Sequence, residues 1–86
     1  MIHASHPSII ARLKRANGHL ASVIAMFEEG RSCHDLSQQL HAVESAVSNA
    51  KRELIHDHIE HCLEETSDRA SQRETLKELK ALTKYL

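Results

Sequence analysis

The chain has 86 residues, with 11 Lys and Arg against 12 Asp and Glu, and a formal net charge of −1. This length suits one domain over residues 1–86, and so short a chain builds only a modest core, for which oligomerisation is a common remedy. A net charge near zero gives no general signal of nucleic-acid binding. No apolar run approaches the about 20 residues of a membrane span. No signal peptide is evident, so we expect a cytoplasmic protein with reduced cysteines and no membrane partner.

The first predicted element is a helix over residues 7–29. Pro7 suits the first turn of a helix, and apolar residues recur at helical spacing as far as Phe27. Residues 1–6, MIHASH, precede it and are expected to form a flexible arm that carries His3 and His6. With 2 Gly and 1 Pro in the whole chain, turns are few and an all-α fold is favoured.

A long second helix is predicted over residues 33–64, after a turn in which Gly30 ends the first helix and Ser32 caps the second. Its apolar residues alternate spacings of four and three, as in a coiled coil, and no strand period fits them. This stripe consists of Leu36, Leu40, Val43, Val47, Ala50 and Leu54. Because the turn is short, we expect the two helices to form an antiparallel hairpin, and two hairpins to form a four-helix-bundle homodimer.

A third, shorter helix is predicted over residues 71–85, after a loop at 65–70. Ser71 followed by Glu74 matches the capping-box pattern S-x-x-E. We expect this helix to cover one end of the bundle or to mediate further assembly.

Three metal-ligand side chains extend the stripe of the second helix at its two ends. His58 and Cys62 are one turn apart, so they can bind a single ion together. Cys33 lies 25 positions before His58, about 37 Å along a continuous helix, and cannot join them within one chain. If two copies pack antiparallel, Cys33 of each meets His58 and Cys62 of the other. The spacing therefore predicts two intersubunit metal sites on a buried face.

Two thiolates and one imidazole suit Cu(I), Ni(II), Co(II) or Zn(II), and we expect one transition-metal ion per subunit. Three ligands complete a trigonal Cu(I) site, whereas Ni(II) and Co(II) need more ligands, which His3 and His6 can supply. Polar residues nearby are candidates to hydrogen-bond the ligands. They are Asp57, Glu60, His61, Glu74 and Glu78.

Basic residues cluster at 12–15 and 51–52. Arg12 and Arg15 share one face of the first helix with His19. Oligomerisation multiplies such a patch and makes a phosphate-binding surface more credible. No helix-turn-helix, zinc-finger or basic-zipper pattern is present. The basic residues of the two clusters are Arg12, Lys14, Arg15, Lys51 and Arg52.

The segments RLKRANGHL, Cys33, QQLHAVESAV and DHIEHC, in this order, resemble the small all-helical repressors of the copper-sensitive operon repressor (CsoR) type. That family includes nickel/cobalt-responsive RcnR-like and formaldehyde-responsive FrmR-like members. The resemblance covers residues 7–64, about two thirds of the chain. It implies hairpin dimers that pair into tetramers, with the apo form bound to a G/C-tract inverted repeat upstream of an efflux gene and released by metal. It also implies that Cys33, His58 and Cys62 are the ligands, with Glu78 near a supporting Glu of the copper sensors. By the same resemblance, the expected DNA-contacting residues are Arg12, Lys14, Arg15, Lys51 and Arg52.

Departures from the family pattern bear on the inducer. Copper-sensing members often have Tyr where this chain has Ser32, and formaldehyde sensors have Pro where it has Ile2. Cys62 replaces the usual non-thiol of the formaldehyde sensors, and His58 is absent from persulfide sensors. These residues favour a metal sensor, and the His-bearing arm favours Ni(II) or Co(II) over Cu(I). A formaldehyde- or sulfur-sensing member stays the alternative within the family.

The leading hypothesis is a metal-responsive transcriptional repressor without enzyme activity. The main rival is a metal buffer or chaperone that never touches DNA, which would need an exposed, exchangeable site. A zinc enzyme would need an open coordination position and a general base, and the sequence has no H-E-x-x-H. A purely structural helical dimer is the remaining alternative.

Overall fold

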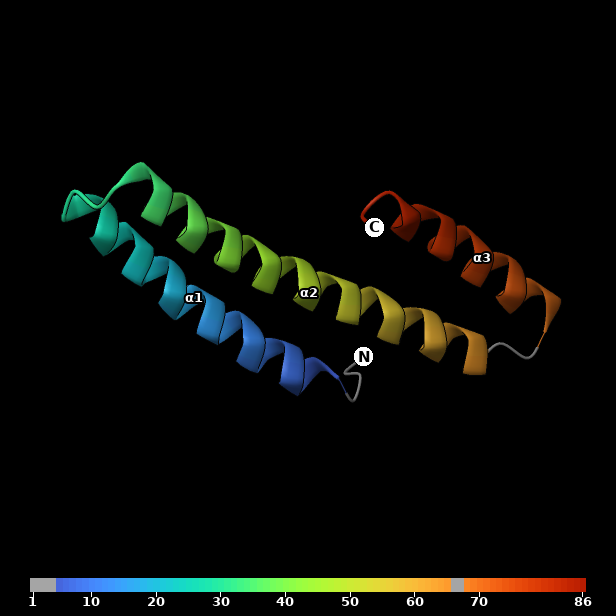
Figure 1. The fold of residues 1–86 in the computed structure, drawn as a ribbon. Helices are drawn as coiled ribbons and strands as arrows, with labels where there is room; N and C mark the ends of the chain where they lie inside the picture. Colours follow the sequence, from blue (N-terminus) through green and yellow to red (C-terminus); the bar gives the residue numbers. More distant parts are fainter. Residues whose placement is uncertain (1–4, 66–67) are drawn as a thin grey trace.

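The computed structural model describes residues 5–65 and 68–86, and it contains three α-helices and no strand in these ranges. They are α1 (His6–Glu28), α2 (Cys33–Glu65) and α3 (Arg69–Thr83), as Figure 1 shows. The predicted all-α class and the three helices are confirmed. Of the arm expected at residues 1–6, residues 1–4 lie outside the described residues, and His3 is one of them. No described helix is both long enough and apolar enough to cross a bilayer.

The turn between α1 and α2 follows the local rules that predicted it. Gly30 adopts a positive φ of 76°, and its N–H donates to the carbonyl of Phe27 at 3.1 Å, which ends α1. The Ser32 hydroxyl accepts a hydrogen bond from the backbone N–H of Asp35 at 3.1 Å and caps α2. Both ends are therefore satisfied within a short connection, and the chain reverses direction.

The start of α3 differs from the prediction. Asp68, not Ser71, is the N-cap, and its carboxylate accepts the backbone N–H of Ser71 at 2.8 Å. This hydrogen bond holds the pKa of the Asp68 carboxyl below its ordinary value. Asp and Ser are both good N-cap residues, and the helix uses the earlier one, so it begins about half a turn before the predicted start. The predicted capping box at Ser71 was therefore wrong. The helix also ends at Thr83 rather than at residue 85.

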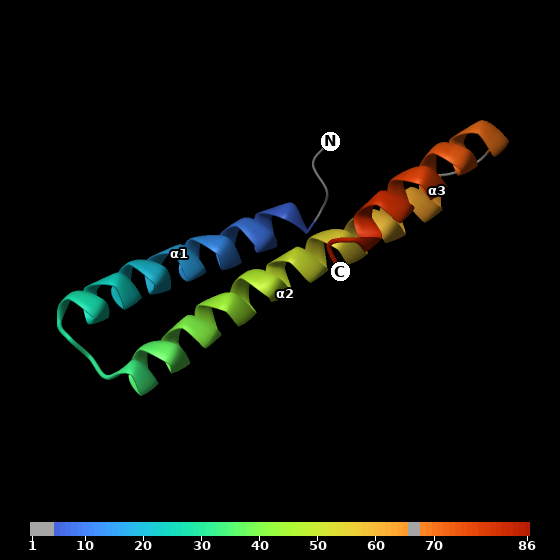
Figure 2. The ribbon, with the colours of Figure 1, turned by 90° about the horizontal axis from the view of Figure 1, so that it is seen from above.

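The three helices form an elongated layer with α2 at its centre. In Figures 1 and 2, α1 runs antiparallel along the first part of α2, and α3 folds back along the last part. The difference in length explains this division, because α2 has 33 residues and α1 has 23. The end of α2 that projects beyond α1 is the part that α3 covers.

In residues 5–65 and 68–86, one line of small and medium apolar side chains is buried between α1 and α2. Its members are Ile9, Ala16 and Val23 from α1, and Leu36, Val43 and Ala50 from α2. On each helix they recur every seven residues, so only alternate members of the predicted stripe reach this seam. Leu40, Val47 and Leu54, which complete the stripe, keep 42% to 46% of their surface exposed. Half of the predicted stripe is thus left uncovered within one chain.

The single chain lacks the interior of a compact domain. Its principal extents are 58 × 24 × 13 Å and its radius of gyration is 17.7 Å. A compact domain of this length would have a radius of about 12 Å. The chain is therefore a thin layer about one helix thick in its shortest dimension, with much apolar surface left on it.

Candidate functional site

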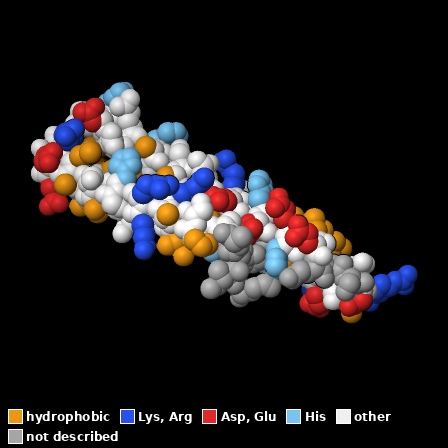
Figure 3. All heavy atoms as spheres, turned by 90° about the horizontal axis from the view of Figure 1, so that it is seen from below, with side chains coloured by type: hydrophobic (Ala, Val, Ile, Leu, Met, Phe, Trp, Pro, Cys, Tyr) orange, Lys and Arg blue, Asp and Glu red, His pale blue; other side chains and the backbone are white. Residues whose placement is uncertain are grey.

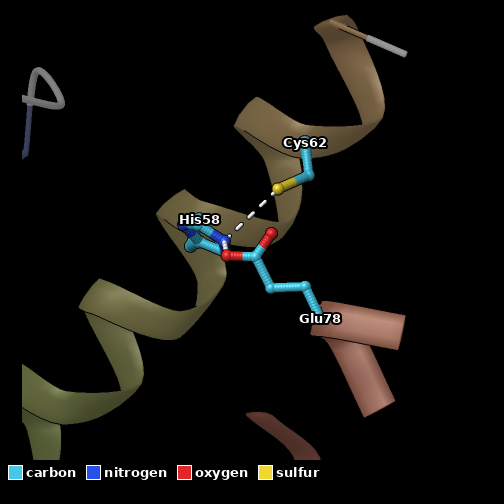
Figure 4. A group of neighbouring side chains, drawn as sticks. All are labelled: His58, Cys62 and Glu78. Carbon is cyan, nitrogen blue, oxygen red and sulfur yellow. Dashed lines mark hydrogen bonds and ion pairs between the residues drawn. The ribbon is translucent and has the colours of Figure 1, made fainter. Parts of the chain in front are cut away.

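Three metal-ligating side chains meet where α3 folds back on α2. The Nε2 atom of His58 lies 2.8 Å from Oε1 of Glu78 and 3.3 Å from Sγ of Cys62. One donor atom from each residue lies within 4.8 Å of the other two. Figure 4 shows the Glu78 side chain reaching from α3 towards the His58 and Cys62 side chains of α2. We call this group the His–Cys–Glu cluster.

Local structure explains why these three residues meet. His58 and Cys62 are one turn apart on α2 and so share one face of it. Glu78 comes from the third turn of α3, whose apolar residue Leu82 lines a small pocket with Leu54, His58 and Glu78. The packing of α3 against α2 therefore sets the position of the carboxylate beside the imidazole.

The cluster presents nitrogen, sulfur and oxygen donors, which together suit a borderline divalent ion. Because Nε2 of His58 faces both other groups, two arrangements are open. An ion can be held by all three residues, or Glu78 can accept the Nε2 proton and leave Nδ1 as the ligand atom. In the structure Glu78 contacts His58 directly, and its role beside an ion stays a prediction.

Cys33 lies apart from the cluster. It is the first residue of α2, and α2 is continuous from Cys33 to Glu65, so the length of the helix separates it from His58 by about 37 Å. Its side chain is exposed in the single chain, whereas those of His58 and Cys62 are half-buried. The predicted buried face is one between two subunits, so the burial of all three ligands stays a prediction. Cys33 sits at the end of the hairpin where the turn joins α1 to α2.

The remaining predicted metal-site residues are not part of the cluster. Glu74 is exposed on α3, one turn before Glu78, and His61 is half-buried beside Cys62. His6 is half-buried as the first residue of α1 rather than part of an arm. His3 lies outside the described residues. Ligation by His3 or His6 stays a prediction.

The expected DNA-contacting residues divide into two groups. Arg12 and Arg15 line a shallow depression between α1 and α2 together with His19 and Asn49. The Arg52 guanidinium donates to the side-chain oxygen of Asn49 at 3.4 Å and extends this line. We call these residues, Arg12, Arg15, His19, Asn49 and Arg52, the polar strip. A space-filling view shows Lys and Arg side chains over the middle of the hairpin, with acidic side chains towards both ends (Figure 3).

Lys14 and Lys51 are exposed but do not line the depression. Each residue of a helix is turned by about 100° from the one before it, so Lys14 points well away from Arg12, and Lys51 away from Arg52. The sequence clusters 12–15 and 51–52 therefore do not form one continuous patch on the hairpin.

Sequence reasoning missed two contacts that join α1 to α2 at this surface. The imidazole of His19 lies 2.6 Å from the side-chain oxygen of Gln39, and Nη1 of Arg12 lies 3.1 Å from Oε2 of Glu53. Both depend on how the two helices are aligned along their axes. The pattern of either helix alone does not carry that information.

Comparison with known proteins agrees with these features. A family model described as "Metal-sensitive transcriptional repressor" matches residues 5–85. The copper-sensing transcriptional repressor CsoR of Mycobacterium ulcerans (strain Agy99) is 45% identical over 51 residues, which are 59% of this chain and 44% of that protein. CsoR of Bacillus subtilis (strain 168) is 32% identical over 71 residues, 83% of this chain and 70% of that protein. The match spans about half the length of the mycobacterial relatives.

A solved structure shares the whole architecture. The nickel-responsive transcriptional regulator InrS superposes with a TM-score of 0.86 at 28% identity, over 100% of this chain and 98% of that chain. These relatives are named as transcriptional regulators, in agreement with the expectation that the chain is not an enzyme. The family match over almost the full length, with this shared fold, leads to one conclusion: the chain belongs to the family of metal-sensitive transcriptional repressors.

Proposed function

We propose that the chain is a metal-responsive repressor of a metal efflux or resistance operon. Its apo form binds a G/C-tract inverted repeat in the operator and is released when an ion binds between two subunits. The ligands are Cys33 of one subunit and His58 and Cys62 of the other. The observation that carries this proposal is the His–Cys–Glu cluster at one end of α2, with a second thiol at the other end of the same straight helix.

An apolar face on the hairpin supports the dimer that this site needs. It consists of Leu13, Leu20, Phe27, Leu40, Val47 and Leu54, each between 40% and 53% exposed. Leu13 follows Arg12 and Leu54 follows Glu53, so this apolar face and the polar strip flank the buried seam on opposite sides. Two hairpins that bury their apolar faces form a four-helix bundle and leave both polar strips exposed. Pairs of such dimers then form the tetramer.

An antiparallel pairing of two α2 helices across this apolar face completes the metal site. Cys33 of one subunit then lies at the level of the partner's His–Cys–Glu cluster, and the pairing occurs twice by symmetry. The donors fit Ni(II), Co(II) or Cu(I), one ion per subunit, and Zn(II) fits the same set. Additional ligands from His3 or His6 would favour Ni(II) and Co(II).

Release from DNA follows from linkage. An ion that joins the ends of two α2 helices favours one arrangement of the hairpins, and the polar strips then fit the operator phosphates less well. A coupling free energy of about 1–3 kcal/mol changes DNA affinity about 5- to 150-fold.

Replacement of Arg15 by alanine is expected to weaken DNA binding while metal affinity changes little. Arg15 lines the polar strip and is exposed, so its loss removes a phosphate contact from each subunit that binds DNA. The dependence of log affinity on log salt should fall by about one for each lost contact. Fluorescence anisotropy over a salt series measures both quantities. Arg31→Ala, which removes the same charge at the hairpin turn, is the matched control, and equal effects of the two variants would remove Arg15 from the surface.

Replacement of Glu78 by glutamine is expected to weaken Co(II) or Ni(II) binding about 10- to 100-fold. The amide keeps the size of the side chain but removes the charge that lies 2.8 Å from His58 Nε2. Absorbance of the Co(II)-thiolate bands during titration reports the affinity. Glu74→Gln, an exposed position one turn earlier on α3, should behave as wild type. If Glu74→Gln weakened binding as much as Glu78→Gln, the cluster would not explain the role of Glu78.

A metal buffer without DNA binding is the second candidate function, and one observation favours it. Cys33 is exposed in the single chain, as an exchangeable site requires. Titration of the apo protein onto its own upstream DNA separates the two candidates. Tight, salt-dependent binding supports the repressor, and binding no stronger than to unrelated DNA supports the buffer.

A further inference from the structure

One acidic residue stands beside the polar strip. Glu53 follows Arg52 on α2, and its carboxylate reaches across to Arg12 on α1, with Oε2 3.1 Å from Nη1. The Glu53 side chain is 29% exposed and that of Arg12 is 46% exposed. A negative charge at this place opposes any phosphate that approaches the strip.

The contact is a charge pair without the geometry of an aligned hydrogen bond. Oε2 of Glu53 is screened from water and has no hydrogen-bond partner despite the nearby guanidinium. Arg12 therefore gives up no aligned hydrogen bond when it turns from Glu53 to another anion. Pairs of this exposure contribute little to stability, so the helix hairpin does not depend on this one.

We propose that Glu53 is a built-in competitor of DNA phosphate, which holds Arg12 in the apo protein and lowers the affinity of the polar strip for the operator. This inference rests on the proposed DNA-binding function. On binding, Arg12 exchanges the Glu53 carboxylate for a phosphate oxygen, and the Glu53 charge stays beside the strip. Because Glu53 lowers the affinity of the apo protein for the operator, a modest coupling free energy between metal binding and DNA binding is enough to release the protein.

The test measures operator affinity of the full-length apo protein by fluorescence anisotropy, for wild type and Glu53→Gln. The variant is expected to bind about two- to fivefold more tightly for each subunit that contacts DNA, the range set by the strength of a part-exposed ion pair. Glu44→Gln is the matched control. Glu44 is exposed and lies nine positions before Glu53, which places it on the opposite side of α2. The operator affinity of Glu44→Gln should therefore stay within twofold of wild type.

A second variant, Glu53→Ala, shows whether the change in affinity is specific to glutamine. Glutamine and alanine are both good helix formers, so both variants should keep α2 intact. Circular dichroism checks that helix content is kept. In an Arg12→Ala background, Glu53→Gln should have a smaller effect, because the guanidinium that it releases is absent. Unchanged or weaker DNA binding by both Glu53 variants, with wild type binding normally, would overturn this inference alone. Absence of salt-dependent DNA binding by wild type would overturn the proposed function and this inference together.

Discussion

Replacement of Cys33 by alanine is expected to leave operator binding by the apo protein intact and to abolish metal-induced release. Cys33 lies at the end of α2 remote from the cluster, so its loss leaves the polar strip unchanged. The His–Cys–Glu cluster of each subunit still holds donors for an ion. Without the thiolate of the second subunit, however, a bound ion no longer joins two α2 helices, and the coupling of about 5- to 150-fold should fall to about one.

Anisotropy of labelled operator DNA with and without metal gives this coupling directly. Ser37→Ala, one turn further along α2 and also exposed, is the control and should release normally. Metal binding by the Cys33 variant, followed by Co(II) absorbance, should persist with lower affinity. Normal release by Cys33→Ala would show that the ion does not act across the subunit interface.

Replacement of Val47 by glutamate is expected to dissociate the dimer and, with it, to remove both operator binding and high-affinity metal binding. Val47 lies in the middle of the apolar face of α2 and is 46% exposed in the single chain. A carboxylate buried there without a partner destabilises the interface by about 3–5 kcal/mol, and the two-fold symmetry places the change in both subunits. The dimer dissociation constant should rise at least about 100-fold.

Sedimentation equilibrium at micromolar concentration measures this change. His41→Glu serves as the control, because His41 is exposed, six positions away and turned by about 120° from Val47. It adds a carboxylate to the same helix without entering the apolar face. A Val47→Glu protein with unchanged mass and normal metal-induced release would contradict the proposed interface.

The hairpin could be predicted from the sequence because its determinants are local. The turn needs a residue with positive φ, which Gly30 supplies, and a cap, which Ser32 supplies. The heptad spacing of α2 likewise identified the apolar stripe. It did not show that Leu36 is buried within the chain while Leu40 is left half-exposed, because the two lie on adjacent sides of one helix.

The candidate site could be predicted only as far as single helices determine it. The spacing of His58 and Cys62 places them on one turn whatever surrounds them. The direct contact of Glu78 with His58, two residues 20 positions apart in sequence, depends on where α3 folds back and packs against α2. The pairing of Arg12 with Glu53 depends in the same way on the alignment of α1 with α2. The start of α3 was missed for a simpler reason, since Asp68 and Ser71 are both good caps.

In the proposed mechanism, one ion held between two subunits reduces the affinity of the protein for its operator. The most direct test is an anaerobic titration of the apo protein on its own upstream DNA, followed by fluorescence anisotropy, with Cu(I), Ni(II), Co(II) and Zn(II) added in turn. We expect tight, salt-dependent binding of the apo form and release at about one equivalent of at least one of these ions per subunit. Apo protein that binds the DNA but stays bound in the presence of every ion would show that metal does not control operator binding.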